Sequence, residues 1–169
     1  MSENKKNSVL IVDDEQINLK ILTHILEKDY TVFTTSDGIS AVEKAKEFLP
    51  DLILLDIVMQ NMDGYETLSR LKNCEETKNI PVIFITGLSN DEEEEKGLTL
   101  GAVDYVTKPF SAIIVKLRVS QQIHIVNQAR TIEQLSSVLA DLQSSAEISA
   151  AAGSETSGEK EFNENSVSN

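Results

Sequence analysis

Apolar residues fall into two kinds of segment that alternate along the chain. Short continuous runs rich in Val, Ile and Leu are typical of buried strands, and longer stretches with apolar residues every three or four positions are typical of amphipathic helices. The predicted strands span residues 9–12, 30–34, 52–55, 81–85 and 104–107. The predicted helices span residues 16–28, 41–48, 64–72, 91–100 and a segment that begins near residue 111. The pattern therefore predicts five units in which a strand is followed by a helix.

The predicted fold class is α/β. Continuous apolar strands that alternate with helices indicate a doubly wound, five-stranded parallel sheet with helices on both faces. Right-handed crossovers leave few arrangements, of which the strand order 2-1-3-4-5 is the common one. In the first helix, the spacing predicts an apolar face formed by Ile17, Ile21, Leu22, Ile25 and Leu26.

The sequence pattern of the C-terminal region predicts a helical extension over residues 123–150, with a possible coiled coil. Its apolar residues follow an a/d heptad pattern in which Gln128 holds one d position. The pattern consists of Ile125, Ile132, Leu135, Leu139, Leu142 and Ala146. This stripe is open to several interpretations. It pairs with a second chain or with a helix of another domain, or it packs against its own domain or frays. Residues 151–169 are rich in Ser, Glu, Asn and Gly, which predicts a disordered acidic and polar tail.

The composition limits the kinds of partner that we expect the protein to bind. The 169 residues carry a net charge of −13, which disfavours nucleic acid and anionic membrane surfaces and favours proteins or cations as partners. No segment approaches the roughly 20 apolar residues of a membrane span, and no basic recognition helix is visible. A single cysteine and the lack of a signal peptide's apolar core predict a cytoplasmic protein without a disulfide framework.

Chemistry-bearing residues follow four of the predicted strands. Asp13 and Asp14 leave the first strand and Asp56 ends the third, and the predicted order makes these two strands neighbours. Three carboxylates held together either raise a pKa or recruit a cation, and oxygen ligands suit Mg²⁺ or Mn²⁺. Thr86 and Lys108 leave the fourth and fifth strands toward the same edge. Each residue alone is typical of a turn or a cap, but the set supplies what phosphoryl transfer to an aspartate requires.

The segments that carry these residues resemble the receiver domain of two-component response regulators. The resemblance covers residues 6–122 and rests on "VLIVDDE", "PDLILLDIVMQNMDGYE", "IPVIFITG" and "GAVDYVTKPF", in the family's order and spacing. It implies that Asp56 accepts the phosphoryl group and that Lys108 contacts that group. It also implies that Mg²⁺ is held by Asp13, Asp14, Asp56 and the backbone carbonyl of Val58.

The resemblance further implies a conformational switch. Thr86 and Tyr105 would form the switch pair, and the peptide bond between Lys108 and Pro109 would be cis, which proline makes accessible. Gln60 departs from the family, which commonly has proline there. That position therefore loses a fixed φ and gains a backbone N–H donor.

The implied function is a phosphorylation-dependent signalling receiver without activity on other substrates. Its implied partners are a sensor histidine kinase or a histidine phosphotransfer protein, and a downstream protein effector. Two alternatives stay open at this point. One is an aspartyl-phosphate phosphatase of haloacid-dehalogenase-like type. That family has D-x-D at its nucleophile, and here Val58 occupies the position of the second Asp. The other is a constitutive binding module with a vestigial site.

Two apolar side chains bear on the lifetime of the phosphorylated state. In the resembled family, the positions that correspond to Val58 and Leu88 border the path of the hydrolytic water. Neither side chain can orient a water molecule. The sequence therefore predicts slow self-dephosphorylation.

Overall fold

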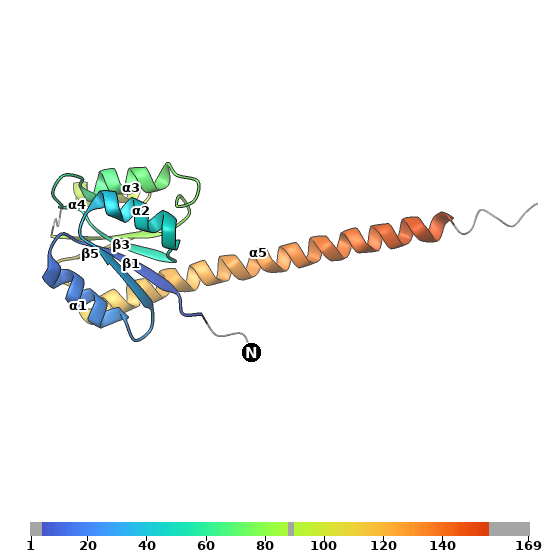
Figure 1. The fold of residues 1–169 in the computed structure, drawn as a ribbon, viewed down its shortest axis with the longest axis horizontal. Helices are drawn as coiled ribbons and strands as arrows, with labels where there is room; N and C mark the ends of the chain where they lie inside the picture. Colours follow the sequence, from blue (N-terminus) through green and yellow to red (C-terminus); the bar gives the residue numbers. More distant parts are fainter. Residues whose placement is uncertain (1–4, 88–89, 156–169) are drawn as a thin grey trace, which may run out of the picture. The chain divides into compact units, whose positions relative to one another are not determined.

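The chain forms strands and helices in strict alternation. The computed structural model describes residues 5–87 and 90–155 (Figure 1). The strands are β1 (Ser8–Val12), β2 (Thr31–Thr35), β3 (Leu52–Asp56), β4 (Val82–Thr86) and β5 (Asp104–Thr107). The helices are α1 (Gln16–Leu26), α2 (Gly38–Phe48), α3 (Gly64–Lys72), α4 (Asp91–Thr99) and α5 (Ala112–Glu155). All five predicted units are therefore present, with ends that differ from the predicted ends by a few residues.

The five strands form one parallel sheet in the order β2-β1-β3-β4-β5, which confirms the predicted topology. In the register between β1 and β3, Val12 lies opposite Leu55, and Asp56 lies opposite Ile85 of β4. The residues that follow Val12 and Leu55 therefore emerge beside one another. We call this side of the molecule, where the strands end, the carboxyl edge.

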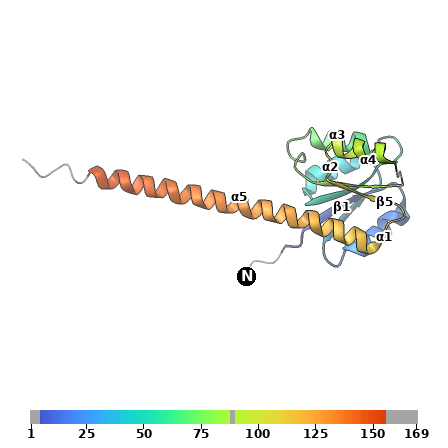
Figure 2. The same ribbon diagram turned by 180° about the vertical axis from the view of Figure 1, so that it is seen from behind.

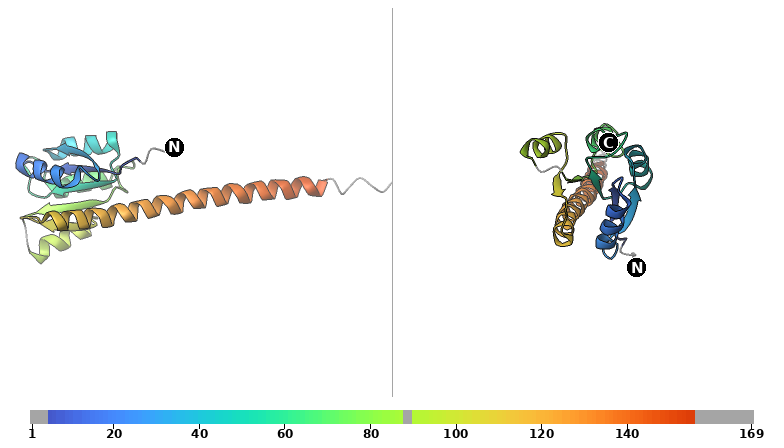
Figure 3. Two further views of the ribbon diagram at one scale, coloured as in Figure 1. Left: turned by 90° about the horizontal axis from the view of Figure 1, so that it is seen from below. Right: turned by 90° about the vertical axis from the view of Figure 1, so that its left-hand side faces the viewer.

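Two apolar layers cover the sheet. Alternate strand residues such as Ile11 and Leu54 pack with side chains of α1 and of α5 as far as Ile123. The intervening residues, such as Leu10 and Leu55, pack with side chains of α2 and α3. Figure 2 and the right-hand view in Figure 3 show α2, α3 and α4 on one face and α1 with the first turns of α5 on the other. Burial on both faces explains why the strands are continuously apolar.

The predicted apolar face of α1 is partly wrong. Ile17 and Ile21 are 59% and 42% exposed, whereas Leu19 is buried. The buried stripe consists of Leu19, Leu22, Ile25 and Leu26. Helical spacing alone gave too wide an apolar arc, because the sheet contacts only the part of the helix that faces it.

Side-chain caps fix where three of the helices begin. Asp37, Asp63 and Asn90 each accept a hydrogen bond from a backbone N–H in the first turn of α2, α3 and α4. Such caps satisfy amide groups that have no partner within the helix, and each contributes about 1 kcal/mol. The cap at Asp63 also sets the direction in which the chain leaves the loop after β3.

The chain divides into two units, residues 1–126 and 127–169. The described part of the second unit is the remainder of α5, and its side chains from 127 to 154 are all exposed. The helix continues to Glu155, beyond the boundary at 150 that the sequence suggested for the tail. Residues 156–169 of the predicted tail lie outside the described residues. None of the described helices is both long enough and apolar enough to cross a membrane.

Candidate phosphoacceptor site

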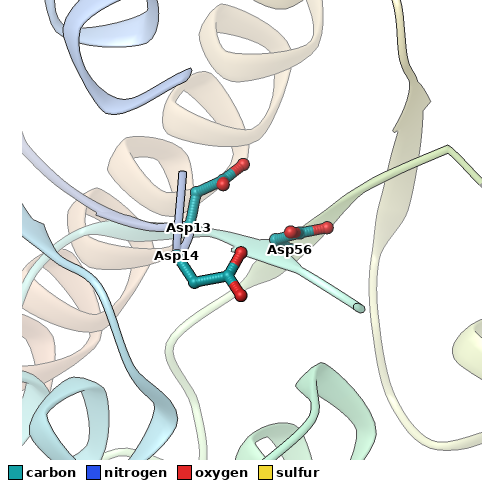
Figure 4. Close-up of side chains that lie close together, drawn as sticks. All are labelled: Asp13, Asp14 and Asp56. Atoms are coloured by element: carbon teal, nitrogen blue, oxygen red, sulfur yellow. The ribbon is translucent and has the colours of Figure 1, made fainter. Parts of the chain in front are cut away.

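Three aspartates meet at the carboxyl edge. Asp13 and Asp14 directly follow β1, and Asp56 is the last residue of β3. Figure 4 shows their side chains gathered at the ends of these two strands, and one carboxylate oxygen of each lies within 4.8 Å of the others. The residues that the sequence placed in one crevice are therefore together in the structure.

Asp13 is the most firmly held of the three. Its side chain is 1% exposed, and Oδ1 accepts a hydrogen bond of 2.9 Å from the backbone N–H of Glu15. Oδ2 accepts hydrogen bonds from Asn18 Nδ2 at 3.0 Å and from Lys108 Nζ at 2.9 Å. Charge-assisted hydrogen bonds of this kind fix both the position and the rotation of a carboxylate. No sequence pattern indicated Asn18, whose place in the first turn of α1 puts it within reach of Asp13.

Lys108 joins Asp13 to Asp56. Its Nζ lies 3.2 Å from Asp56 Oδ2, although the two residues come from β3 and from the segment after β5. Burial lowers the pKa of Lys108, but the neighbouring carboxylates of Asp13 and Asp56 outweigh it and leave that pKa above its ordinary value. Lys108 is therefore a fixed positive charge at the site.

Asp56 is buried, and its surroundings disfavour the ionised form of its carboxyl group. Burial and the negative charge of Asp13 raise the pKa of Asp56 to about 6, against the opposing effects of Lys108 and a hydrogen bond from the backbone of Val58. A carboxylate with this pKa is ionised at neutral pH. It is also a better nucleophile than an ordinary aspartate, because its negative charge is poorly solvated.

Asp14 is held differently. It is more open to solvent than the other two aspartates, and its Oδ2 accepts a hydrogen bond of 3.3 Å from the backbone N–H of Gln60. A proline at position 60 would have no such hydrogen to donate. The departure from the family at Gln60 therefore adds a contact to one of the aspartates.

Gly64 lets α3 begin immediately behind Asp56. A β-carbon at this position would lie 2.4 Å from the backbone oxygen of Asp56 and 2.7 Å from the α-carbon of Ile57. The N–H of Gly64 donates a hydrogen bond of 2.8 Å to the carbonyl of Ile57. The absence of a side chain therefore allows the backbone after β3 to fold closely against the start of α3.

The aspartate cluster fits a hard divalent cation. Among the described residues, Lys108 is the cation that the structure sets against these carboxylates, so one positive charge faces a cluster of three carboxylates. Carboxylate oxygens with open space for water are the ligands that Mg²⁺ prefers. Asp13, Asp14 and Asp56 would hold the ion. The backbone carbonyl of Val58 stays a predicted fourth ligand.

Thr86 and Tyr105 border one cavity beside the site. Thr86 is 3% exposed at the end of β4, and both residues line a cavity of about 200 Å³ between α4, β4 and β5. Interaction with Glu94 in the first turn of α4 is the main reason why the pKa of Tyr105 is raised. The predicted switch pair therefore lies around an open space.

A second tyrosine also holds α4. The Tyr65 hydroxyl donates a hydrogen bond to the carboxylate of Glu93, and burial together with this bond raises the pKa of Tyr65. Lys96 Nζ lies 4.0 Å from the centre of the Tyr65 ring, which is a cation–π contact. No sequence pattern indicated this cluster, because Tyr65 and Glu93 belong to different helices.

Two further predictions concern the loops of the site. The peptide bond between Lys108 and Pro109 is cis, as predicted. Val58 is 60% exposed next to Asp56. Leu88 lies outside the described residues, so slow self-dephosphorylation stays a prediction.

Known proteins share this fold and these segments. Residues 9–120 match the response regulator receiver domain. A Vibrio cholerae protein named "Probable cyclic di-GMP phosphodiesterase" is 43% identical over 119 residues, covering 70% of this chain and 27% of that protein. Response regulator PleD of Caulobacter vibrioides is 39% identical over 66% of this chain and 25% of its own length. The crystal structure of chemotaxis protein CheY4 of Vibrio cholerae superposes with a TM-score of 0.65 at 28% identity, covering 70% of this chain and 98% of that one.

The chain belongs to the response regulator receiver domain family, the receivers of two-component systems. Receiver domains are signalling modules that bind Mg²⁺ at an acidic pocket and interact with histidine kinases and downstream effectors. This chain spans about a quarter of the length of the two curated relatives named above. The names of those longer proteins describe the whole proteins.

Proposed function

We propose that this protein receives a phosphoryl group on Asp56 from a phosphohistidine of a sensor kinase or a histidine phosphotransfer protein. The observation that carries the proposal is the buried, ionisable Asp56, bridged by Lys108 to Asp13 within a cluster of three carboxylates. The acidic surface supports protein partners rather than nucleic acid. The proposal includes the cytoplasm as the location, which is typical of receiver domains.

The chemistry follows from the placement of each group. The Asp56 carboxylate attacks phosphorus, the bond from phosphorus to the donor's imidazole nitrogen breaks, and the imidazole leaves with that electron pair. Lys108 donates hydrogen bonds to the transferring phosphoryl oxygens and offsets their negative charge. Asp13 holds Lys108 in place for this role through the 2.9 Å contact. Bound Mg²⁺ would supply further positive charge that offsets the negative charge of the phosphoryl oxygens.

The phosphorylated state would then change the face formed by α4, β5 and α5. The Thr86 hydroxyl would move to donate a hydrogen bond to the phosphoryl group. The Tyr105 ring would turn into the cavity that both residues line and give up its bond to Glu94. Phosphorylation would therefore shift the population of α4 conformers that a downstream effector meets.

The test is incubation of the full chain with acetyl phosphate and Mg²⁺, followed by intact-mass measurement. We expect wild type to gain one phosphoryl group and Asp56→Asn to gain none. Asp29→Asn, an exposed carboxylate away from the site, is the matched control and should behave like wild type. An adduct that survives in Asp56→Asn would contradict the proposal. Failure of wild type to form any adduct would instead indicate a vestigial site, and steady turnover of added phosphomonoesters would indicate a phosphatase.

A further inference from the structure

The part of α5 beyond Ile123 carries a solvent-exposed aliphatic stripe. Val115, Val119 and Ile123 are buried in the first unit. Ile125 and the aliphatic residues from Ile132 onward are exposed, including Ile132 at 64% and Leu139 at 60%. The described residues of the second unit form a single helix, so no other element within that unit covers the stripe. A lone helix with an aliphatic stripe in water is only marginally stable, and most helices gain their stability from packing of that stripe.

The stripe repeats every three and a half residues rather than every 3.6, which is the spacing of a two-stranded coiled coil. Its a positions are Ile125, Ile132, Leu139 and Ala146, and its d positions are Gln128, Leu135 and Leu142. A β-branched residue at a with Leu at d, as at Ile132 and Leu135, favours two strands over three or four.

The charged residues of this segment lie away from the a and d positions and from the neighbouring e and g positions. Every charged residue between 125 and 149 falls at a b, c or f position, away from a partner helix; these are Arg130, Glu133, Asp141 and Glu147. The e and g positions next to the seam carry Ala, Ser, Thr, Val and Gln. Two identical helices therefore meet along this seam without placing like charges opposite each other, which is the condition that a second copy of the same chain must satisfy.

Gln128 distinguishes the two possible orientations. In a parallel, in-register pair, Gln128 faces its own copy and the two amides donate to and accept from each other. Ile125 then faces Ile125. In the antiparallel register that keeps Ile132 against Leu142, Gln128 faces Ala146 and has no polar partner, and Ile125 faces a serine. A buried amide without a partner costs about 1–3 kcal/mol. The parallel register pairs polar with polar and aliphatic with aliphatic side chains.

We infer that residues 125–146 of two copies of this chain pair as a parallel, in-register, two-stranded coiled coil, so that the protein is a homodimer. The inference does not depend on phosphorylation of Asp56, because it rests on residues 125–146 of α5 and not on the site around Asp56.

The first experiment is light scattering of the full chain over a concentration series. We expect the mass of wild type to rise to twice the monomer mass, and Leu139→Glu to stay monomeric at concentrations where wild type is dimeric. Ile148→Glu is the matched control, since Ile148 is 71% exposed but lies at a c position off the seam. It should dimerise like wild type. Thermal melting of each variant checks that the first unit is folded. A wild-type monomer at all concentrations, a trimer, or equal loss of dimer in both variants would overturn the inference.

The second experiment tests orientation by disulfide formation in a Cys74→Ser background. We expect Ala146→Cys chains to form covalent dimers with one another on mild oxidation, because parallel pairing sets position 146 against itself. A mixture of Ala146→Cys chains and tagged Gln128→Cys chains should then give dimers of like chains only. Crosslinks between the two kinds of chain, with none between like chains, would show antiparallel pairing and overturn the parallel register.

Discussion

The carboxyl edge has two halves that are built differently. Beyond β1 and β3, Asp13 and Asp56 are almost completely buried and are tied together by Lys108, and α3 behind them buries Leu68 and Leu71 in the core. Beyond β4, a cavity of about 200 Å³ separates the sheet from parts of α4. Of the residues in α4, which are all described, Gly97 is the one that is buried.

The two halves differ in the way that phosphoryl transfer and a conformational response to it require. A phosphoryl group is transferred efficiently only between groups that are already in position, and buried charge with short hydrogen bonds provides this. A helix that responds to the transfer needs another position of similar free energy, which a densely packed core does not allow. The half around Asp56 therefore suits catalysis, and the half around α4 suits movement.

The largest expected effect comes from adding one methyl group in the first half. Gly64→Ala would press a β-carbon against the Asp56 backbone at 2.4 Å, which cannot yield without displacing β3. We expect a loss of about 3 kcal/mol in the free energy of unfolding, measured by urea denaturation. Gly97→Ala in the second half is the matched control. Its β-carbon meets the Phe84 ring at 3.0 Å beside the cavity, and alanine favours a helix by about 1 kcal/mol. We expect a change within about 0.5 kcal/mol of zero, and equal losses would remove the contrast between the halves.

The raised pKa of Asp56 predicts a pH dependence of stability in the absence of divalent cations. Because its pKa in the folded state is about 6 and the ordinary value is 3.8, the folded protein binds this proton more tightly than the unfolded chain. The resulting stability is present below pH 3.8 and is lost as the pH rises through 6. Asp56→Asn should therefore be more stable than wild type at pH 7.5 in EDTA, by about 2 to 3 kcal/mol. Unfolding curves from pH 4 to 8 test this, and parallel profiles for the two proteins would contradict it.

Addition of Mg²⁺ should stabilise the first half of the edge. At ten times its dissociation constant, a ligand that binds only the folded state contributes about 1.4 kcal/mol. We expect the melting temperature to rise with millimolar MgCl₂ and to rise least in Asp14→Ala, which removes the aspartate that Lys108 does not contact. NaCl at equal ionic strength is the control. A melting temperature indifferent to Mg²⁺ would argue against a metal site.

Loss of one hydroxyl at the contact between α3 and α4 should loosen α4 alone. Tyr65→Phe removes the hydrogen bond to Glu93 but keeps the ring against Phe84 and Lys96. A hydrogen bond to a charged group contributes about 1.5 kcal/mol at the low end of its range. We expect amide hydrogen exchange in α4 to accelerate by roughly fivefold or more while exchange in α3 and β3 is unchanged. Equal acceleration in both helices would mean that the two halves are not separate.

The smallest effect concerns Gln60. Gln60→Pro removes the N–H that donates to Asp14, and Gln60→Ala keeps it. We expect the proline variant to bind Mg²⁺ roughly threefold more weakly than the alanine variant, which corresponds to about 0.6 kcal/mol. Isothermal titration of both variants gives the two constants. Identical constants would mean that this contact does not position Asp14.

The sequence was enough to predict the features that follow from the order of residues in each strand and from the order of the strands along the chain. Continuous apolar strands and right-handed crossovers were enough to predict the sheet order, and the sheet order brought Asp13 and Asp56 together. The sequence did not predict contacts whose partners are set by loop geometry, such as Gln60 with Asp14 or Tyr65 with Glu93. No local periodicity encodes which side chains of two separate segments will face each other.

The positions of the tyrosines have a spectroscopic consequence. The chain has no tryptophan and three tyrosines, so its intrinsic ultraviolet emission comes from tyrosine alone. The Tyr65 hydroxyl is hydrogen-bonded to Glu93 in the first turn of α4, and the Tyr105 hydroxyl interacts with Glu94 of the same turn. The third fluorophore, Tyr30, packs against the apolar core. A carboxylate that accepts a hydrogen bond from a phenol quenches its emission. The tyrosine fluorescence of the unlabelled protein therefore reports on α4, and its intensity should increase when these contacts with the glutamates are lost.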